Sequence, residues 1–84
     1  MKYRLLLDIE VVEFIAALPR REQVRLRRRL GEIQKSPARF ADFQEPDGTG
    51  RQLDVHVHSG FALYYWEDFA DRHVKVLRIR RADV

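Results

Sequence analysis

The chain has 84 residues, the size of one small domain and too few for two independent hydrophobic cores. It contains no cysteine, which excludes disulfides, thiolate metal sites and thiol nucleophiles. The net charge is only +3, but most of the basic residues are arginines, whose rigid guanidinium groups suit the recognition of phosphate and carboxylate.

Two further features of the sequence bear on where the protein works. No apolar run approaches the roughly 20 residues of a membrane-spanning helix. The first residues also lack the basic-then-apolar pattern of a secretory signal. We therefore expect a cytoplasmic protein with no membrane partner.

The first half of the chain predicts one strand and two helices. Residues 2–7 alternate as a strand that is buried on at least one side. Asp8 is a predicted N-cap before a helical apolar stripe over residues 9–18. Pro19 ends that helix and can start a second one over residues 20–35. Because the link is so short, we expect an antiparallel helical hairpin whose apolar stripes cover a sheet.

The second half predicts an antiparallel sheet. Residues 51–58 alternate between apolar and polar, with Leu53, Val55 and Val57 expected inward and Gln52, Asp54, His56 and His58 expected outward. After a turn, residues 61–66 are apolar on both faces and are expected in the sheet interior. Residues 73–81 form a last strand, whose alternation slips near Val76 and Leu77 as at a β-bulge. Phe43 is assigned to a short strand that pairs with the one after it.

The predicted fold class is therefore α+β: an N-terminal strand, a helical hairpin and then three or four antiparallel strands. Residues 1–84 are expected to form this single domain.

Residues 49–66, with the turn Ser59-Gly60 and the run Phe61-Ala62-Leu63-Tyr64-Tyr65-Trp66, and the closing residues 74–81 carry a family resemblance. With this order of elements, the chain resembles the RelE/ParE superfamily of toxins from bacterial type II toxin–antitoxin systems over nearly its whole length. The resemblance implies a compact toxin neutralised by a cognate antitoxin protein. One branch of the family cleaves messenger RNA on the ribosome, and another inhibits DNA gyrase.

Position by position, the resemblance to the RNA-cleaving branch is incomplete. Asp54 and His56 stand where that branch presents outward lysines, and Ala62 stands where it commonly has arginine. Arg80 and Arg81 match its basic pair, but no tyrosine follows them. Three alternatives stay open: an endoribonuclease (mRNA interferase) with a degenerate site, a non-catalytic binding protein of this fold, and a DNA gyrase inhibitor.

RNA cleavage by the 2′-hydroxyl needs a base, an acid and cations around the phosphorane. On this basis and on the resemblance, the residues expected to be catalytic are His56, Arg81 and Tyr64, and those expected to bind nucleic acid are Arg51, His58, Arg78 and Arg80. The alternative is that the two histidines have no role in function and are either solvated or paired with Asp54 and Glu67. A His-x-His strand offers too few donors for a metal, and no glycine-rich phosphate loop occurs, so no metal or cofactor is expected.

Charge is grouped along the chain. Residues 19–39 hold eight basic and two acidic side chains, whereas residues 40–71 hold one basic and seven acidic ones. The arginines of the second helix have three interpretations: a docking surface for an acidic antitoxin segment, a solvated surface, and a contact to nucleic acid.

Overall fold

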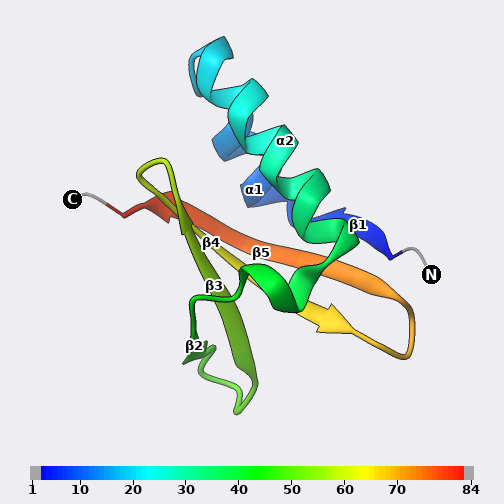
Figure 1. The fold of residues 1–84 in the computed structure, drawn as a ribbon. Helices are drawn as coiled ribbons and strands as arrows, with labels where there is room; N and C mark the ends of the chain where they lie inside the picture. The colour runs from blue at the N-terminus through cyan, green and yellow to red at the C-terminus, as the bar shows by residue number, and fades with distance from the viewer. Residues whose placement is uncertain (1–2, 83–84) are drawn as a thin grey trace.

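The structure, a computed structural model, describes residues 3–82. Its elements in chain order are β1 (Arg4–Leu7), α1 (Ile9–Ala16), α2 (Arg20–Lys35), the 3-10 turn η1 (Pro37–Phe40), β2 (Phe43–Pro46), β3 (Gln52–His58), β4 (Phe61–Asp68) and β5 (His73–Arg81), as Figure 1 shows. This order confirms the α+β prediction.

One five-stranded sheet holds every strand of the described chain, in the order β1-β5-β4-β3-β2. The four later strands are antiparallel, and β4 lies in the interior as its two apolar faces predicted. The N-terminal strand β1 pairs in parallel with β5, which makes the sheet mixed. The sequence pattern shows that β1 is a strand but not which strand it joins.

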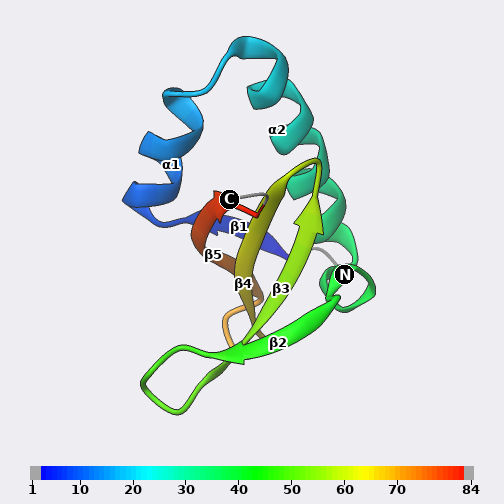
Figure 2. The ribbon, with the colours of Figure 1, turned by 90° about the vertical axis from the view of Figure 1, so that its left-hand side faces the viewer.

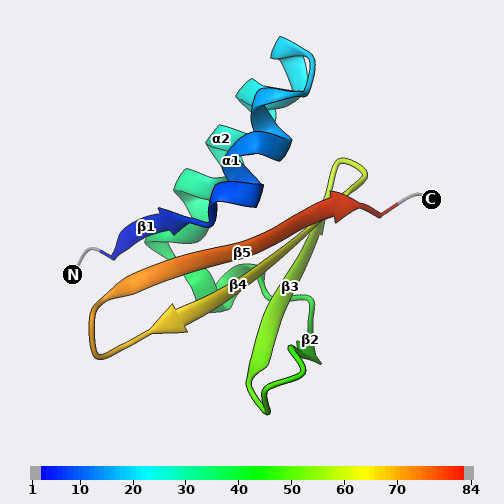
Figure 3. The same ribbon diagram turned by 180° about the vertical axis from the view of Figure 1, so that it is seen from behind.

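The two helices lie on the same side of this sheet (Figures 1 and 3). The Asp8 side chain accepts a hydrogen bond from the Glu10 amide at 3.1 Å and so caps α1, as predicted. In Figure 2 the chain turns back between α1 and α2, which form the expected antiparallel hairpin. The helix α2 begins at Arg20 and ends at Lys35, which are the predicted bounds.

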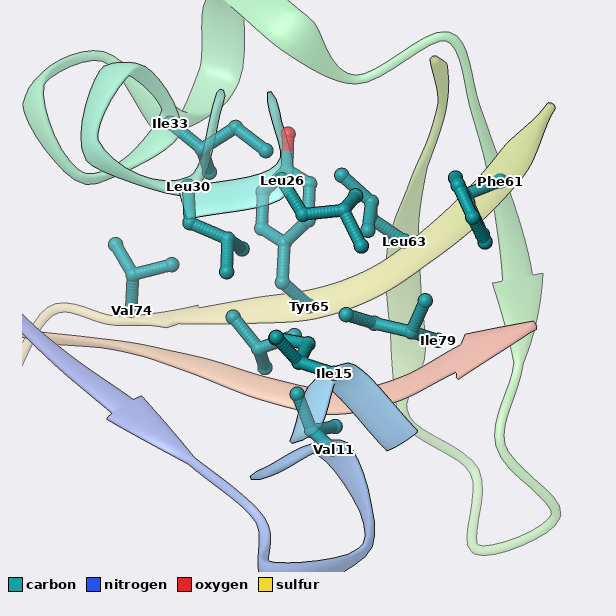
Figure 4. Close-up of a cluster of buried hydrophobic side chains, with 11 residues drawn as sticks. Val11, Ile15, Leu26, Leu30, Ile33, Phe61, Leu63, Tyr65, Val74 and Ile79 are labelled. Carbon is teal, nitrogen blue, oxygen red and sulfur yellow. The ribbon is translucent and has the colours of Figure 1, made fainter. Parts of the chain in front are cut away.

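The main core fills the space between the helices and the sheet. Figure 4 shows the α2 side chains Leu26, Leu30 and Ile33 facing the Tyr65 ring of β4. The Tyr65 hydroxyl donates a hydrogen bond of 2.5 Å to the Pro37 carbonyl. This bond connects η1 to the core, in which Tyr65 is fully buried.

A second, smaller apolar cluster lies on the opposite face of the sheet, which no helix of the described chain covers. Because side chains alternate along a strand, Tyr64 points away from the helices when Tyr65 points toward them. Its buried members are Leu53, Val55, Ala62 and Tyr64, and Trp66, Leu77 and Ala82 pack against it. We call this side the helix-free face.

The predicted orientation of the β3 histidines is wrong. His56 pairs with Leu63 and His58 with Phe61, so both point to the helix-covered side, and His56 is only 8% exposed. Val57, expected inward, is 45% exposed on the helix-free face. Alternation separates the two faces of a strand but does not say which of them the helices cover, and here η1 and α2 cover the histidines.

A β-bulge in β5 confirms the predicted slip. Tyr64 pairs with Arg78 whereas Tyr65 pairs with Val76, so Leu77 is the extra residue. Before the bulge the even-numbered side chains Val74 and Val76 face the helices, and after it the odd-numbered Ile79 does. The bulge therefore places Arg78 and Arg80 on the helix-free face. With regular alternation after Val76, both arginines would have pointed into the core.

Candidate functional site

The helix-free face carries two arginines around a tyrosine. Arg78 lies directly across from Tyr64 in the neighbouring strand, and Arg80 lies across from Ala62. The guanidinium carbons of Arg78 and Arg80 are 5.5 Å and 5.6 Å from the centroid of the Tyr64 ring. Arg80 Nε also donates a hydrogen bond of 2.8 Å to the Tyr64 hydroxyl. The buried tyrosine thus holds both cations over its ring.

This arrangement leaves positive charge exposed on an apolar floor. Arg78 and Arg80 are exposed, and neither forms an ion pair with a carboxylate within residues 3–82. The floor beneath them is the smaller apolar cluster, in which Tyr64 is 3% exposed. Two unpaired guanidinium groups on such a surface can bind an anion such as a phosphodiester through charge-assisted hydrogen bonds.

The predicted residue Arg51 belongs to the neighbouring part of this face. Its guanidinium lies 4.4 Å from the centroid of the Trp66 ring, and its Nε is 3.5 Å from an Asp47 carboxylate oxygen. Hydrogen bonds from Thr49, with a smaller contribution from Arg51, hold the pKa of Asp47 below its ordinary value. Arg51 is therefore partly neutralised by the β2–β3 turn, unlike Arg78 and Arg80.

The structure does not bring the predicted catalytic residues together. Tyr64 lies on the helix-free face, whereas His56 and Arg81 lie on the helix-covered side. The Arg81 guanidinium carbon is 5.0 Å from the centroid of the Phe61 ring. The Arg81 Nη2 is 3.5 Å from a carboxylate oxygen of Glu22, at the start of α2. The topology therefore places these three side chains on two different faces of the sheet.

His56 instead belongs to a cluster at the edge of the core. Its Nδ1 is 2.9 Å from an Asp42 carboxylate oxygen, which also accepts the Val57 amide at 2.8 Å. The Val57 amide, then His56, lower the pKa of Asp42. His56 also packs its ring against Phe40 and against His58. Neither Asp54 nor Glu67 is the partner, and the sequence pattern could not reveal Asp42 because residues 40–50 lack a clear periodicity.

Neither a metal-ion cluster nor a membrane-spanning helix is found within residues 3–82. Residues 3–82 contain no group of three or more His, Cys, Asp or Glu side chains arranged to hold a metal ion. Over the same residues, neither helix combines the length and the apolar content that crossing a bilayer requires.

Comparison with known proteins rests on structure alone. No protein-family profile and no curated protein sequence matches the chain. Among solved structures, the RelE of the archaeal RelE–RelB complex from Pyrococcus horikoshii superposes with a TM-score of 0.79 at 21% identity, covering 98% of this chain and 97% of that one. An arginine-to-alanine mutant of the E. coli toxin RelE in the free state gives 0.69 at 21% identity, covering 99% of this chain and 86% of that one. The chain therefore has the fold of the RelE toxins.

Proposed function

We propose that the chain is the toxin component of a type II toxin–antitoxin module that acts in the cytoplasm on messenger RNA at the ribosome. The observation that carries the proposal is the pair Arg78 and Arg80 around Tyr64, exposed and without a carboxylate partner among residues 3–82, on a chain with the RelE fold. These cations would bind the phosphodiester backbone of the message, and residues 1–84 would act as one domain.

A cognate antitoxin protein is the proposed partner. The archaeal structure that resembles this chain is a complex of RelE with RelB. The exposed arginines Arg20, Arg21 and Arg27 of α2 offer charge complementary to an acidic antitoxin segment, so part of the neutralising contact is proposed there.

One observation favours a second candidate, a non-catalytic binding protein or a DNA gyrase inhibitor. General acid–base cleavage needs a titratable group within hydrogen-bond reach of the 2′-hydroxyl. Among residues 3–82, however, His56 and His58 lie on the other side of the sheet from Arg78 and Arg80. The hydroxyl that Arg80 contacts is that of Tyr64, and phenols titrate far above neutral pH.

Growth after induction tests the toxin proposal. We expect expression of the chain alone to arrest growth and co-expression of the neighbouring gene to relieve the arrest. The double variant R78Q/R80Q should grow, because it lacks both phosphate-binding cations. The matched control R20Q/R27Q removes the same charge from exposed positions on α2 and should stay toxic. Unimpaired growth with the wild-type chain at full expression would contradict the proposal.

Translating ribosomes distinguish the two candidates. We expect purified protein to cut a defined message on ribosomes, with cut sites mapped by primer extension. R78Q/R80Q should cut at least about a hundredfold more slowly, which is the loss that removal of a single oxyanion donor causes. An intact message together with loss of DNA supercoiling by gyrase would support the second candidate instead.

A further inference from the structure

A second cluster of arginines lies on the other side of the sheet from the proposed RNA-binding face. Arg25, Arg28 and Arg29 of α2 line a groove of about 450 Å³ with His58 and Ser59 of the β3–β4 turn. Figure 2 shows this turn beside α2. The groove shares no residue with Tyr64, Arg78 and Arg80.

The turn that closes this groove has a defined shape. Ser59 has a φ of 52° and Gly60 a φ of 83°, and a two-residue hairpin turn with both φ values positive is of type I′. The turn therefore holds His58 and the Ser59 hydroxyl at a fixed place beside α2. Both side chains add neutral hydrogen-bonding groups to the arginines.

The groove carries uncompensated positive charge. Arg25 and Arg28 are exposed, and neither lies within ion-pair distance of a carboxylate in the part of the chain that the structure describes. Arg29 is the compensated member, with its Nε 3.3 Å from a carboxylate oxygen of Glu32, the acidic residue that also lines the groove. Burial, and then the charge of Arg29, lower the pKa of His58, which agrees with a positive potential in the groove.

We propose that this groove binds the phosphodiester backbone of a nucleic-acid strand. Arg25 and Arg28 are three residues apart on a helix, which sets their Cβ atoms about 5–6 Å apart, so that their long side chains can reach neighbouring phosphates. An acidic peptide helix would need an apolar stripe to dock against, and Val24 is the only large apolar side chain among the residues that line the groove. The lining therefore favours phosphates over an amphipathic segment.

The groove lies at the same end of the sheet as the helix-free arginines. His58 pairs with Phe61 and Ala62 pairs with Arg80, so the groove and Arg80 flank the β3–β4 turn on its two sides. A strand of several nucleotides that passes this turn would contact both. The groove would then add affinity, while the helix-free face would keep the role proposed above.

Salt-dependent binding of a short, fluorescein-labelled 2′-O-methyl RNA tests the groove, since this probe lacks the hydroxyl that cleavage requires. Each single-strand phosphate contact contributes about 0.7 to the slope of log K against log salt concentration. The variant R25Q/R28Q should therefore lower the slope by about 1.4 and weaken binding roughly 25-fold at about 0.1 M salt. The control R20Q/R27Q removes the same charge from another face of α2 and should change both values much less.

The outcomes separate this inference from the proposed function. If R25Q/R28Q binds like R20Q/R27Q while R78Q/R80Q binds more weakly, the groove proposal is overturned and the proposed function stands. If oligoglutamate of equal charge binds as tightly as the RNA and depends equally on Arg25 and Arg28, the groove serves an acidic protein partner and the proposal is also overturned. A DNA strand of the same sequence should bind comparably, because the proposed contacts are to phosphates. Thermal unfolding by circular dichroism checks that each variant is folded.

Discussion

Two adjacent tyrosines in β4 show how much a single position determines. Tyr65 points into the core, where its hydroxyl donates to the Pro37 carbonyl, whereas Tyr64 points to the helix-free face, where its hydroxyl accepts from Arg80. The variant Tyr65→Phe would leave a buried carbonyl without its partner, so we expect it to lower the free energy of unfolding by about 1–2 kcal/mol in urea denaturation. Tyr64→Phe should cost less than about 0.5 kcal/mol, because Arg80 is exposed and can be hydrated instead. Equal losses in the two variants would contradict this assignment.

The second residue-scale prediction concerns pH. Burial, followed by the charges of Arg29 and His56, lowers the pKa of His58 below its ordinary value of 6.5. Between that lowered pKa and 6.5 the unfolded chain binds more protons than the folded one, so the free energy of unfolding should fall as the pH drops through this window. A further decline should begin near pH 3.8, where Asp42, whose pKa is lowered chiefly by the Val57 amide, becomes protonated in the unfolded chain. In urea denaturation from about pH 8 to about pH 3, His58→Gln should remove the first decline and keep the second. Persistence of both declines would show that another group is responsible for the first.

At the scale of elements, the bulge in β5 decides which side chains the helix-free face receives. Leu77 is the extra residue. Deleting it would make the alternation of Val74, Val76 and Ile79 regular, and Arg78 and Arg80 would still point to the helix-free face. We therefore expect the Leu77 deletion to fold, as judged by circular dichroism, and to bind the 2′-O-methyl RNA within about threefold of the wild-type affinity. Removal of even one arginine–phosphate interaction would weaken binding more than that, by about fivefold at about 0.1 M salt. A folded deletion variant without RNA affinity would mean that the bulge itself shapes the site.

The elements were also the part of the structure that the sequence predicted best. Asp8 predicted the start of α1, Pro19 predicted the start of α2, and alternation predicted the strands, because these signals are local in the sequence. The side of the sheet that His56 and His58 face depends on where α2 and η1 pack, which is a tertiary property that a local pattern does not contain. The parallel pairing of β1 with β5 escaped prediction for the same reason. Of the predicted site residues, Arg78, Arg80 and Tyr64 do lie together, but His56 and Arg81 do not join them.

At the scale of the whole molecule, the sheet separates two basic surfaces. The helix-free face presents Arg78 and Arg80 on an apolar floor, and the helix-covered side presents the groove of Arg25 and Arg28. This separation explains how a chain with a net charge of only +3 can present two concentrated positive surfaces.

The central claim is that the helix-free face binds RNA, and an NMR titration of the ¹⁵N-labelled chain with the 2′-O-methyl RNA tests it most directly. We expect the Arg80 Nε resonance and the amide resonances of Ala62, Tyr64 and Arg78 to shift progressively as RNA is added, because the side chains of these residues lie on the helix-free face. If these resonances stay unchanged at RNA concentrations that saturate other sites on the chain, the helix-free face is not the RNA-binding face and the central claim is wrong.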